Sequence, residues 1–126
     1  MKLHADQATT TSIQAHGEGW IQVNGQRYTH SVLVSSANGV MPWNVHAFDD
    51  LQPEFFAELR NFEPEVVVFG SGTKLRFPKP AVMQPLVQAK IGWETMSTAA
   101  ACRTFNILAQ EGRTVVAALL IESRNP

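Results

Sequence analysis

A glycine-rich loop is the first segment whose residue types could bind a ligand. Gly70, Ser71, Gly72 and Thr73 directly follow the continuous apolar run 66–69. Parallel sheets bind ligands beyond the carboxyl ends of their strands, and the backbone N–H groups of a glycine-rich turn can surround an anion. The loop lacks the spacing of a Walker phosphate loop. The alternative is a tight connection whose glycines serve only the backbone geometry.

The segment 98–111 is the second candidate, because it reads as a helix with polar residues on one face. Thr98 can cap the start of this helix, and the N–H groups of its first turn can bind an anion. Arg103 and Asn106 share a face, and the guanidinium offers a planar fork of donors to a carboxylate or phosphate. The alternatives are a solvated face on which Arg103 pairs with a nearby carboxylate, or a structural bridge from Arg103 and Glu111.

Cys102 is the only cysteine of the chain and the only candidate thiol nucleophile. A catalytic thiol needs a histidine or a helix N-terminus to lower its pKa. Cys102 lies about one turn into the predicted helix, where the helix dipole still has some effect. Alanines surround it in sequence, and a free cysteine behaves as a small core residue. We therefore interpret Cys102 as part of the apolar face of the helix. That face comprises Ala101, Cys102, Phe105, Leu108 and Ala109.

The remaining residue patterns predict neither a catalytic residue nor a metal site. The four histidines show no short ligand spacing, and one cysteine cannot make a structural zinc site. No serine stands in the Gly-x-Ser-x-Gly pattern of a hydrolase elbow. The sequence thus implies no cofactor and names no reaction.

The elements that must position these residues follow one another in a simple order. An Asn24-Gly25 turn joins two β-rich runs and predicts a tight hairpin. The predicted order is a hairpin over 20–34, a helix over 49–62, a strand over 66–69, a helical stretch over 80–90, a short strand over 93–96, the helix over 98–111 and a strand over 114–121. The apolar runs 66–69 and 114–121 indicate strands in the interior of a sheet.

Prolines and glycines mark the expected ends of the helices. Pro53 suits the first position of a helix, where its missing N–H is not needed. Pro64 should end that helix, and Pro85 should kink or shorten the next one. Gly92 and Gly112 are expected to be the C-terminal stops of the second and third helices.

This alternation predicts an α/β fold in a single domain. We expect a mixed, mostly parallel central β-sheet packed by helices, with an N-terminal antiparallel β-hairpin layer. Residues 1–12 are polar and threonine-rich, so we expect them to be disordered, and residues 13–126 to form the domain.

Composition excludes several classes of partner. The chain has 126 residues and a net charge of −1, which argues against binding of nucleic acid or of an anionic membrane. No apolar run is long enough for a membrane span. The single cysteine gives no sign of an oxidising compartment, and the N-terminal residues lack the apolar region of a signal peptide. We expect a cytoplasmic protein.

Three segments of the chain resemble the Mth-like domain family, namely residues 66–73, 92–108 and 111–113. The most specific part is 98–106 with the Glu-Gly-Arg that follows it. The resemblance covers nearly the whole chain from residue 13. The family includes small bacterial and archaeal proteins of unknown function, a mitochondrial respiratory complex I assembly factor and an adipogenesis-associated protein. This chain has Gly-Ser-Gly over 70–72 where many relatives have Gly-Thr-Gly.

The resemblance implies a mixed central sheet with helices and an extra β layer, and a non-catalytic interaction or assembly-accessory role. The implied partner is a respiratory complex subunit or an assembly protein. The alternative is a protein or enzyme that binds a small anion, with its site at the Gly70–Thr73 loop and the N-terminal half of the helix over 98–111.

Overall fold

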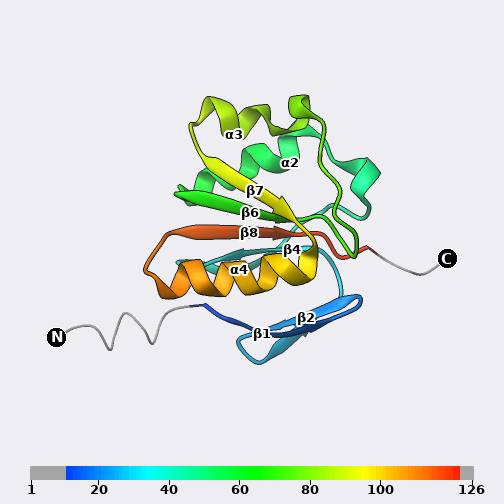
Figure 1. The fold of residues 1–126 in the computed structure, drawn as a ribbon, viewed down its shortest axis with the longest axis vertical. Helices are drawn as coiled ribbons and strands as arrows, with labels where there is room; N and C mark the ends of the chain where they lie inside the picture. The colour runs from blue at the N-terminus through cyan, green and yellow to red at the C-terminus, as the bar shows by residue number, and fades with distance from the viewer. Residues whose placement is uncertain (1–10, 123–126) are drawn as a thin grey trace.

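The computed structural model describes residues 11–122, which form two β-sheets with helices between and beside them (Figure 1). The smaller sheet is antiparallel and has three strands. These are β1 (Ile13–Gly17), β2 (Trp20–Val23) and β3 (Gln26–Tyr28). The predicted hairpin is confirmed at its turn, where Asn24 and Gly25 have φ values of 50° and 85°. Residues 1–10, most of the segment expected to be disordered, lie outside the described part of the chain.

The larger sheet has five strands in the order β5-β4-β8-β6-β7. Their bounds are β4 (Val32–Ser35), β5 (Gly39–Pro42), β6 (Val66–Gly70), β7 (Gly92–Met96) and β8 (Val115–Leu119). β6 pairs in parallel with β7 and β8, whereas β4 pairs antiparallel with β5 and β8. The single α/β domain and the mixed character of the sheet are confirmed, but the expectation that the sheet is mostly parallel is wrong, because β4 makes antiparallel pairs with both of its neighbours.

The sheet is not mostly parallel because of the segment that follows the Asn24-Gly25 turn. The run from Tyr28 to Val34 was expected to be one strand, but it divides between β3 in the small sheet and β4 in the large one. β4 then turns back through Gly39, with φ of 87°, into β5. A second antiparallel hairpin therefore extends the large sheet beside β8.

The helices cover the two faces of the large sheet (Figure 1). The longest, α4 (Thr98–Gln110), packs on β6 and β8 and has β1 of the small sheet on its other side. The opposite face carries short helices. These are η1 (Phe48–Asp50), α2 (Pro53–Ala57), η2 (Glu58–Phe62), η3 (Pro80–Met83) and α3 (Gln84–Gln88).

Alternating side chains of the central strands feed two separate hydrophobic clusters. On β8, Val115, Ala117 and Leu119 contribute to the cluster around α4, and Val116 and Ala118 to the cluster under α2 and α3. β6 divides its residues in the same way. The predictions that 66–69 and 114–121 form interior strands are therefore confirmed.

The proline and glycine signals are only partly correct. Pro53 is the first residue of α2, as predicted, and Pro85 stands in the first turn of α3, which shortens the expected helix over 80–90. Gly92 is not a helix stop. Lys90, with φ of 61°, follows the end of α3, and Gly92 is the first residue of β7. Gly112, with φ of 83°, follows α4 as expected.

Candidate functional site

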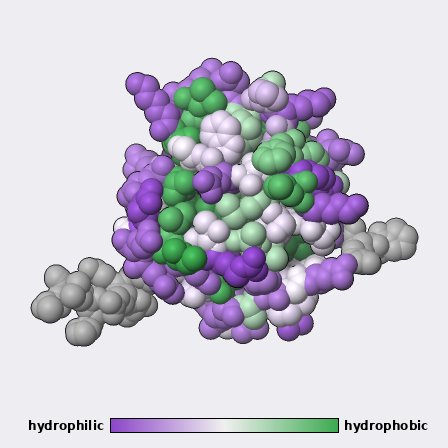
Figure 2. Space-filling model, in the orientation of Figure 1, coloured by the Kyte–Doolittle hydropathy of each residue, from purple (hydrophilic) through white to green (hydrophobic). Residues whose placement is uncertain are grey.

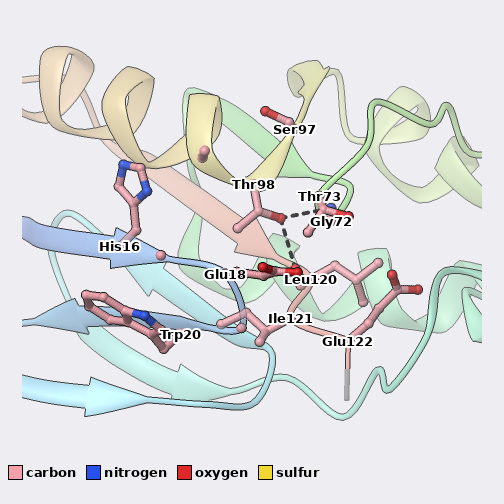
Figure 3. Close-up of a pocket in the computed structure, with 13 residues that line it drawn as sticks. His16, Glu18, Trp20, Gly72, Thr73, Ser97, Thr98, Leu120, Ile121 and Glu122 are labelled. Carbon is pink, nitrogen blue, oxygen red and sulfur yellow. Dashed lines mark hydrogen bonds between the residues drawn. The ribbon is translucent and has the colours of Figure 1, made fainter. Parts of the chain in front are cut away.

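A cavity of about 540 Å³ lies where the two sheets meet the N-terminus of α4 (Figure 3). Its walls come from four segments of the chain, which are residues 16–20 at the β1–β2 turn, residues 72–73 after β6, residues 97–99 at the start of α4 and residues 120–122 after β8. The last three segments lie at the carboxyl ends of parallel strands or at a helix N-terminus, where α/β proteins commonly bind ligands.

Three of the predicted site residues meet in this cavity: Gly72, Thr73 and Thr98. The Gly72 N–H donates a hydrogen bond of 2.9 Å to Thr98 Oγ1, and the Thr98 hydroxyl donates one of 2.9 Å to the Leu120 carbonyl oxygen. The Thr98 N–H donates in turn to the Gly72 carbonyl oxygen at 2.8 Å. Thr98 thus joins the end of β6, the end of β8 and the start of α4.

Thr98 is not the N-cap that the sequence suggested. The N-cap is Ser97, whose hydroxyl accepts a hydrogen bond from the Ala100 N–H at 3.3 Å, and Thr98 is the first helical residue. Both residues have the hydroxyl that capping needs, so residue type alone does not separate them. The Thr98 hydroxyl is engaged by two distant segments, at Gly72 and Leu120, and Ser97 therefore takes the N-cap position.

Gly70 and Ser71 have structural roles. A Cβ atom on Gly70 would lie 2.8 Å from Thr98 Cα, so the close approach of α4 to β6 requires glycine there. Ser71 is fully buried, and its hydroxyl donates to the Lys74 carbonyl oxygen at 2.7 Å and accepts from the Arg76 N–H at 2.9 Å. The alternative of a tight structural connection therefore fits these two residues.

Arg76 and Glu122 form an ion pair at the cavity, and the sequence analysis did not predict it. The Arg76 guanidinium donates to the Ser71 carbonyl oxygen at 2.6 Å and to Glu122 Oε1 at 2.8 Å, and it lies 4.6 Å from the centre of the Phe48 ring. Glu122 Oε2 accepts from the Phe48 N–H at 2.8 Å. Arg76 and Glu122 are 46 positions apart, so no local sequence pattern predicts that they pair.

The environment of Glu122 favours its ionised form. Partial burial alone would raise the pKa of this carboxyl group, but the hydrogen bonds from Arg76 and from the Phe48 N–H outweigh that effect. The pKa of Glu122 is therefore lowered from its ordinary value of 4.5. A carboxylate thus forms part of the cavity wall at neutral pH.

The sequence analysis also did not predict the part of the cavity wall that comes from β1, β2 and the turn between them. His16, Glu18 and Trp20 line the cavity from this side (Figure 3). The Trp20 ring packs against Gly17, where a Cβ atom would collide with it, and the Arg27 guanidinium lies 3.9 Å from the ring centre on Trp20. The only sequence signal was the pair of glycines at 17 and 19 before the tryptophan.

Arg103 and Asn106 do not line the cavity. The Asn106 side chain accepts a hydrogen bond from the Ile13 N–H at 2.9 Å and donates one to the Ile13 carbonyl oxygen at 2.8 Å, so it ties β1 to α4. Arg103 is exposed. A joint site of these two residues with the glycine loop stays a prediction.

Cys102 is buried in the cluster around α4. Burial raises the pKa of its thiol to about 12, and the nearby charge of Arg103 offsets this only in part. The thiol is therefore protonated at neutral pH, which matches its interpretation as a core residue. Of the predicted apolar face, Ala101, Cys102, Phe105 and Ala109 are buried, and Leu108 packs against the same cluster.

The chemistry of the cavity does not favour an anion. Two of the first N–H groups of α4, those of Thr98 and Ala100, are already bonded within the protein, and the carboxylates of Glu18 and Glu122 line the wall. Within residues 11–122, no three histidine, cysteine or acidic side chains gather as they would around a metal ion. No helix in that range is long and apolar enough to cross a membrane.

Curated relatives of this chain include a protein named as an assembly factor of NADH dehydrogenase. The chain is 41% identical over 83 residues to the mouse protein named NADH dehydrogenase [ubiquinone] 1 alpha subcomplex assembly factor 3, which is 64% of this chain and 45% of the relative. The chain spans 45% to 65% of the length of the mouse, bovine and human forms of that protein.

Solved structures share the fold over nearly the whole chain. A crystal structure of a Bordetella parapertussis protein has a TM-score of 0.85 and 34% identity, and covers 90% of this chain and 98% of its own. A solution structure of a Mth938-like domain protein from Bordetella pertussis has a TM-score of 0.80 and 30% identity, over 98% of this chain and 94% of its own. Residues 13–120 match the family described as protein of unknown function (DUF498/DUF598), and the chain belongs to that family.

Proposed function

We propose that this protein is a non-catalytic accessory factor in the assembly of a respiratory complex, and that it acts by binding a subunit or another assembly protein. The observation that carries the proposal is the similarity to an assembly factor named for NADH dehydrogenase, with identities of 41%, 34% and 31% to the mouse, bovine and human proteins. The matched region includes most of the domain, 94% of this chain for the human protein.

The state of three hydroxyl and thiol groups that the sequence singled out supports a binding role over a nucleophilic one. The hydroxyls of Ser71 and Thr98 each hold two partners within the protein. The Cys102 thiol is buried and protonated. Hydroxyl groups whose hydrogen bonds are all made within the protein, and a protonated thiol, are poor nucleophiles, because activation needs an adjacent base or a lowered pKa.

The test is deletion of the gene in the organism that encodes this chain. We expect less assembled NADH dehydrogenase on native gels and lower NADH oxidation by its membranes, with both restored by the wild-type gene. The amount of another respiratory complex serves as the control. Unchanged NADH dehydrogenase after deletion would contradict the proposal.

The cavity favours a second candidate function, the binding of a small molecule. Its volume of about 540 Å³ falls within the range of roughly 300–1,000 Å³ that is usual for ligand pockets. The wall combines the Trp20 ring and Leu120 with hydroxyls of Thr73 and Ser97. We infer that a neutral, partly apolar ligand fits this wall better than the anion that the sequence suggested.

A thermal-shift screen against small metabolites, both neutral and anionic, tests this second function. A ligand at one hundred times its Kd should add about 2.7 kcal/mol to the free energy of unfolding. Ala99 is exposed at the cavity rim, so Ala99→Phe should fill the entrance and abolish the shift, while Arg103→Ala should leave it unchanged. Loss of the shift in Arg103→Ala with an anionic ligand would instead support the site first expected from the sequence.

A cytoplasmic location stays part of the proposal. The buried free thiol of Cys102 is compatible with a reducing compartment. Fractionation of cells that express the tagged protein would check it.

A further inference from the structure

The segment between β6 and η3 presents large apolar side chains to solvent. Leu75 is 55% exposed and Phe77 is 69% exposed, and Phe77 has the largest exposed fraction of any large hydrophobic residue in 11–122. Figure 2 shows hydrophobic residues on the face formed by β7 and this segment, with hydrophilic residues around them. Single exposed apolar side chains are common on protein surfaces, but two of them within three residues form a larger apolar area, of the kind that marks interaction sites.

Arg76 fixes the backbone that carries these two side chains. Its N–H and guanidinium bond to Ser71, its guanidinium pairs with Glu122, and it stacks on the Phe48 ring. Arg76 is half-buried, whereas its neighbours Leu75 and Phe77 on either side are exposed. A surface that is rigid before binding loses little conformational entropy on association.

Two lysines flank this apolar pair in the sequence, and the carboxylate bonded within the segment, that of Glu122, is paired with Arg76. Lys74 and Lys79 are exposed on either side of it, and residues 73–81 contain no acidic residue. Pro78 and Pro80 lack backbone N–H donors, which disfavours pairing with a partner strand along this segment. Recognition through side chains fits the segment better, with apolar groups for Leu75 and Phe77 and carboxylates for the lysines.

We propose that residues 74–79 form a docking surface for an acidic segment of a protein partner that carries apolar side chains between its carboxylates. The inference deepens the proposed assembly role and rests on it for the identity of the partner. Phe77 is the central anchor, since aromatic residues dominate the binding energy of protein interfaces. The lysines increase the association rate and select acidic partners.

The test selects phage-displayed random peptides on the purified full-length protein and measures the affinity of the tightest binders by fluorescence anisotropy. We expect the selected peptides to be acidic and apolar. Phe77→Ser should weaken their binding by at least about 30-fold, the loss typical of an anchor residue. The double variant Lys74→Glu/Lys79→Glu should weaken it too, and binding should fall as salt rises.

Ile107→Ser is the matched control, because Ile107 is 56% exposed on α4 and lies outside the segment. It should bind the peptides as the wild type does. Circular dichroism melting of each variant separates lost binding from lost folding. Equal affinity in wild type and Phe77→Ser, or selection of basic or uncharged peptides, would overturn the proposal.

Two other occupants of the surface would give different results, and each would overturn the proposal. Phe77-dependent binding to vesicles of phosphatidylcholine and phosphatidylglycerol, without peptide binding, would assign the surface to a membrane. A dimer that light scattering detects in the wild type and not in Phe77→Ser would assign it to a second copy. Peptide binding is measured on purified protein and does not depend on the assembly role. A failure of the docking surface can therefore be told apart from a failure of the assembly proposal, which the deletion strain tests.

Discussion

Thr98 connects three segments of the molecule through one hydroxyl group. The hydroxyl accepts from Gly72 and donates to Leu120, each at 2.9 Å. Valine has nearly the same shape but lacks the hydroxyl, so Thr98→Val would leave a donor and an acceptor without their partner.

We expect Thr98→Val to lower the free energy of unfolding by about 1–3 kcal/mol. Urea denaturation followed by circular dichroism measures the loss. Thr104→Val, at a half-buried threonine on the same helix, is the matched control and should change the stability much less. Equal effects of the two substitutions would show that the bridge does not stabilise the fold.

Glu122 should make the stability depend on pH. Its pKa is lower in the folded protein than the ordinary value of 4.5, so its contribution is present above that value and is lost as the pH falls through the folded pKa. Glu122→Gln should therefore destabilise the protein at neutral pH and have a smaller effect at about pH 3. Urea denaturation at both pH values, with Glu94→Gln on β7 as the control, measures the difference. A loss of equal size at both pH values would contradict the role of the ionised carboxylate.

At the scale of elements, glycine allows α4 to lie directly on β6. A Cβ atom on Gly70 would be 2.8 Å from the Thr98 backbone, whereas one on Gly92 would meet nothing within 4 Å. Gly70→Ala should cost about 1–3 kcal/mol, as overpacking of a core does, and Gly92→Ala should be neutral or slightly stabilising. Thermal melts of the two variants test this. Equal melting temperatures would mean that α4 can move away from β6 without loss.

Asn106 joins the small sheet to α4 through its two bonds to Ile13. Asn106→Ala should therefore release β1, and the Ile13 N–H should exchange with deuterated solvent faster. Arg103→Ala, one turn earlier on the exposed face, should leave that exchange rate unchanged. Unchanged exchange in Asn106→Ala would show that the apolar contacts of Ile13 hold β1 without this pair.

The sequence predicted the interior elements of the fold better than its edges. The runs 66–69 and 114–121 are apolar because both faces of their strands are buried, and that signal needs no knowledge of distant residues. β1 is only five residues long and has one large apolar residue, Ile13, so its signal was missed. The antiparallel addition of β4 depends on pairing with β8, far away in the chain, and no local signal encodes it.

The candidate site shows the same division. The glycine loop and Thr98 could be found from their positions after a strand and at a helix start. Arg76, Glu122 and Trp20 could not, because their importance comes from contacts between remote segments. Asn106 was selected for its polar side chain on a helix, but that side chain satisfies the backbone of β1.

At the scale of the whole molecule, two rigid surfaces lie close together. The cavity opens beside Gly72 and Thr73, and the exposed Leu75 and Phe77 follow within the next few residues. The ion pair of Arg76 and Glu122 connects the two surfaces, since Glu122 lines the cavity and Arg76 lies between Leu75 and Phe77.

The most direct test of the assembly role is complementation of the deletion strain with variants of this chain. The amount of assembled NADH dehydrogenase is measured on native gels, with equal expression checked by immunoblot. We predict full restoration by the wild type and by Ile107→Ser, and little restoration by Phe77→Ser. Full restoration by Phe77→Ser would contradict the docking surface, and a deletion strain with normal NADH dehydrogenase would contradict the assembly role itself.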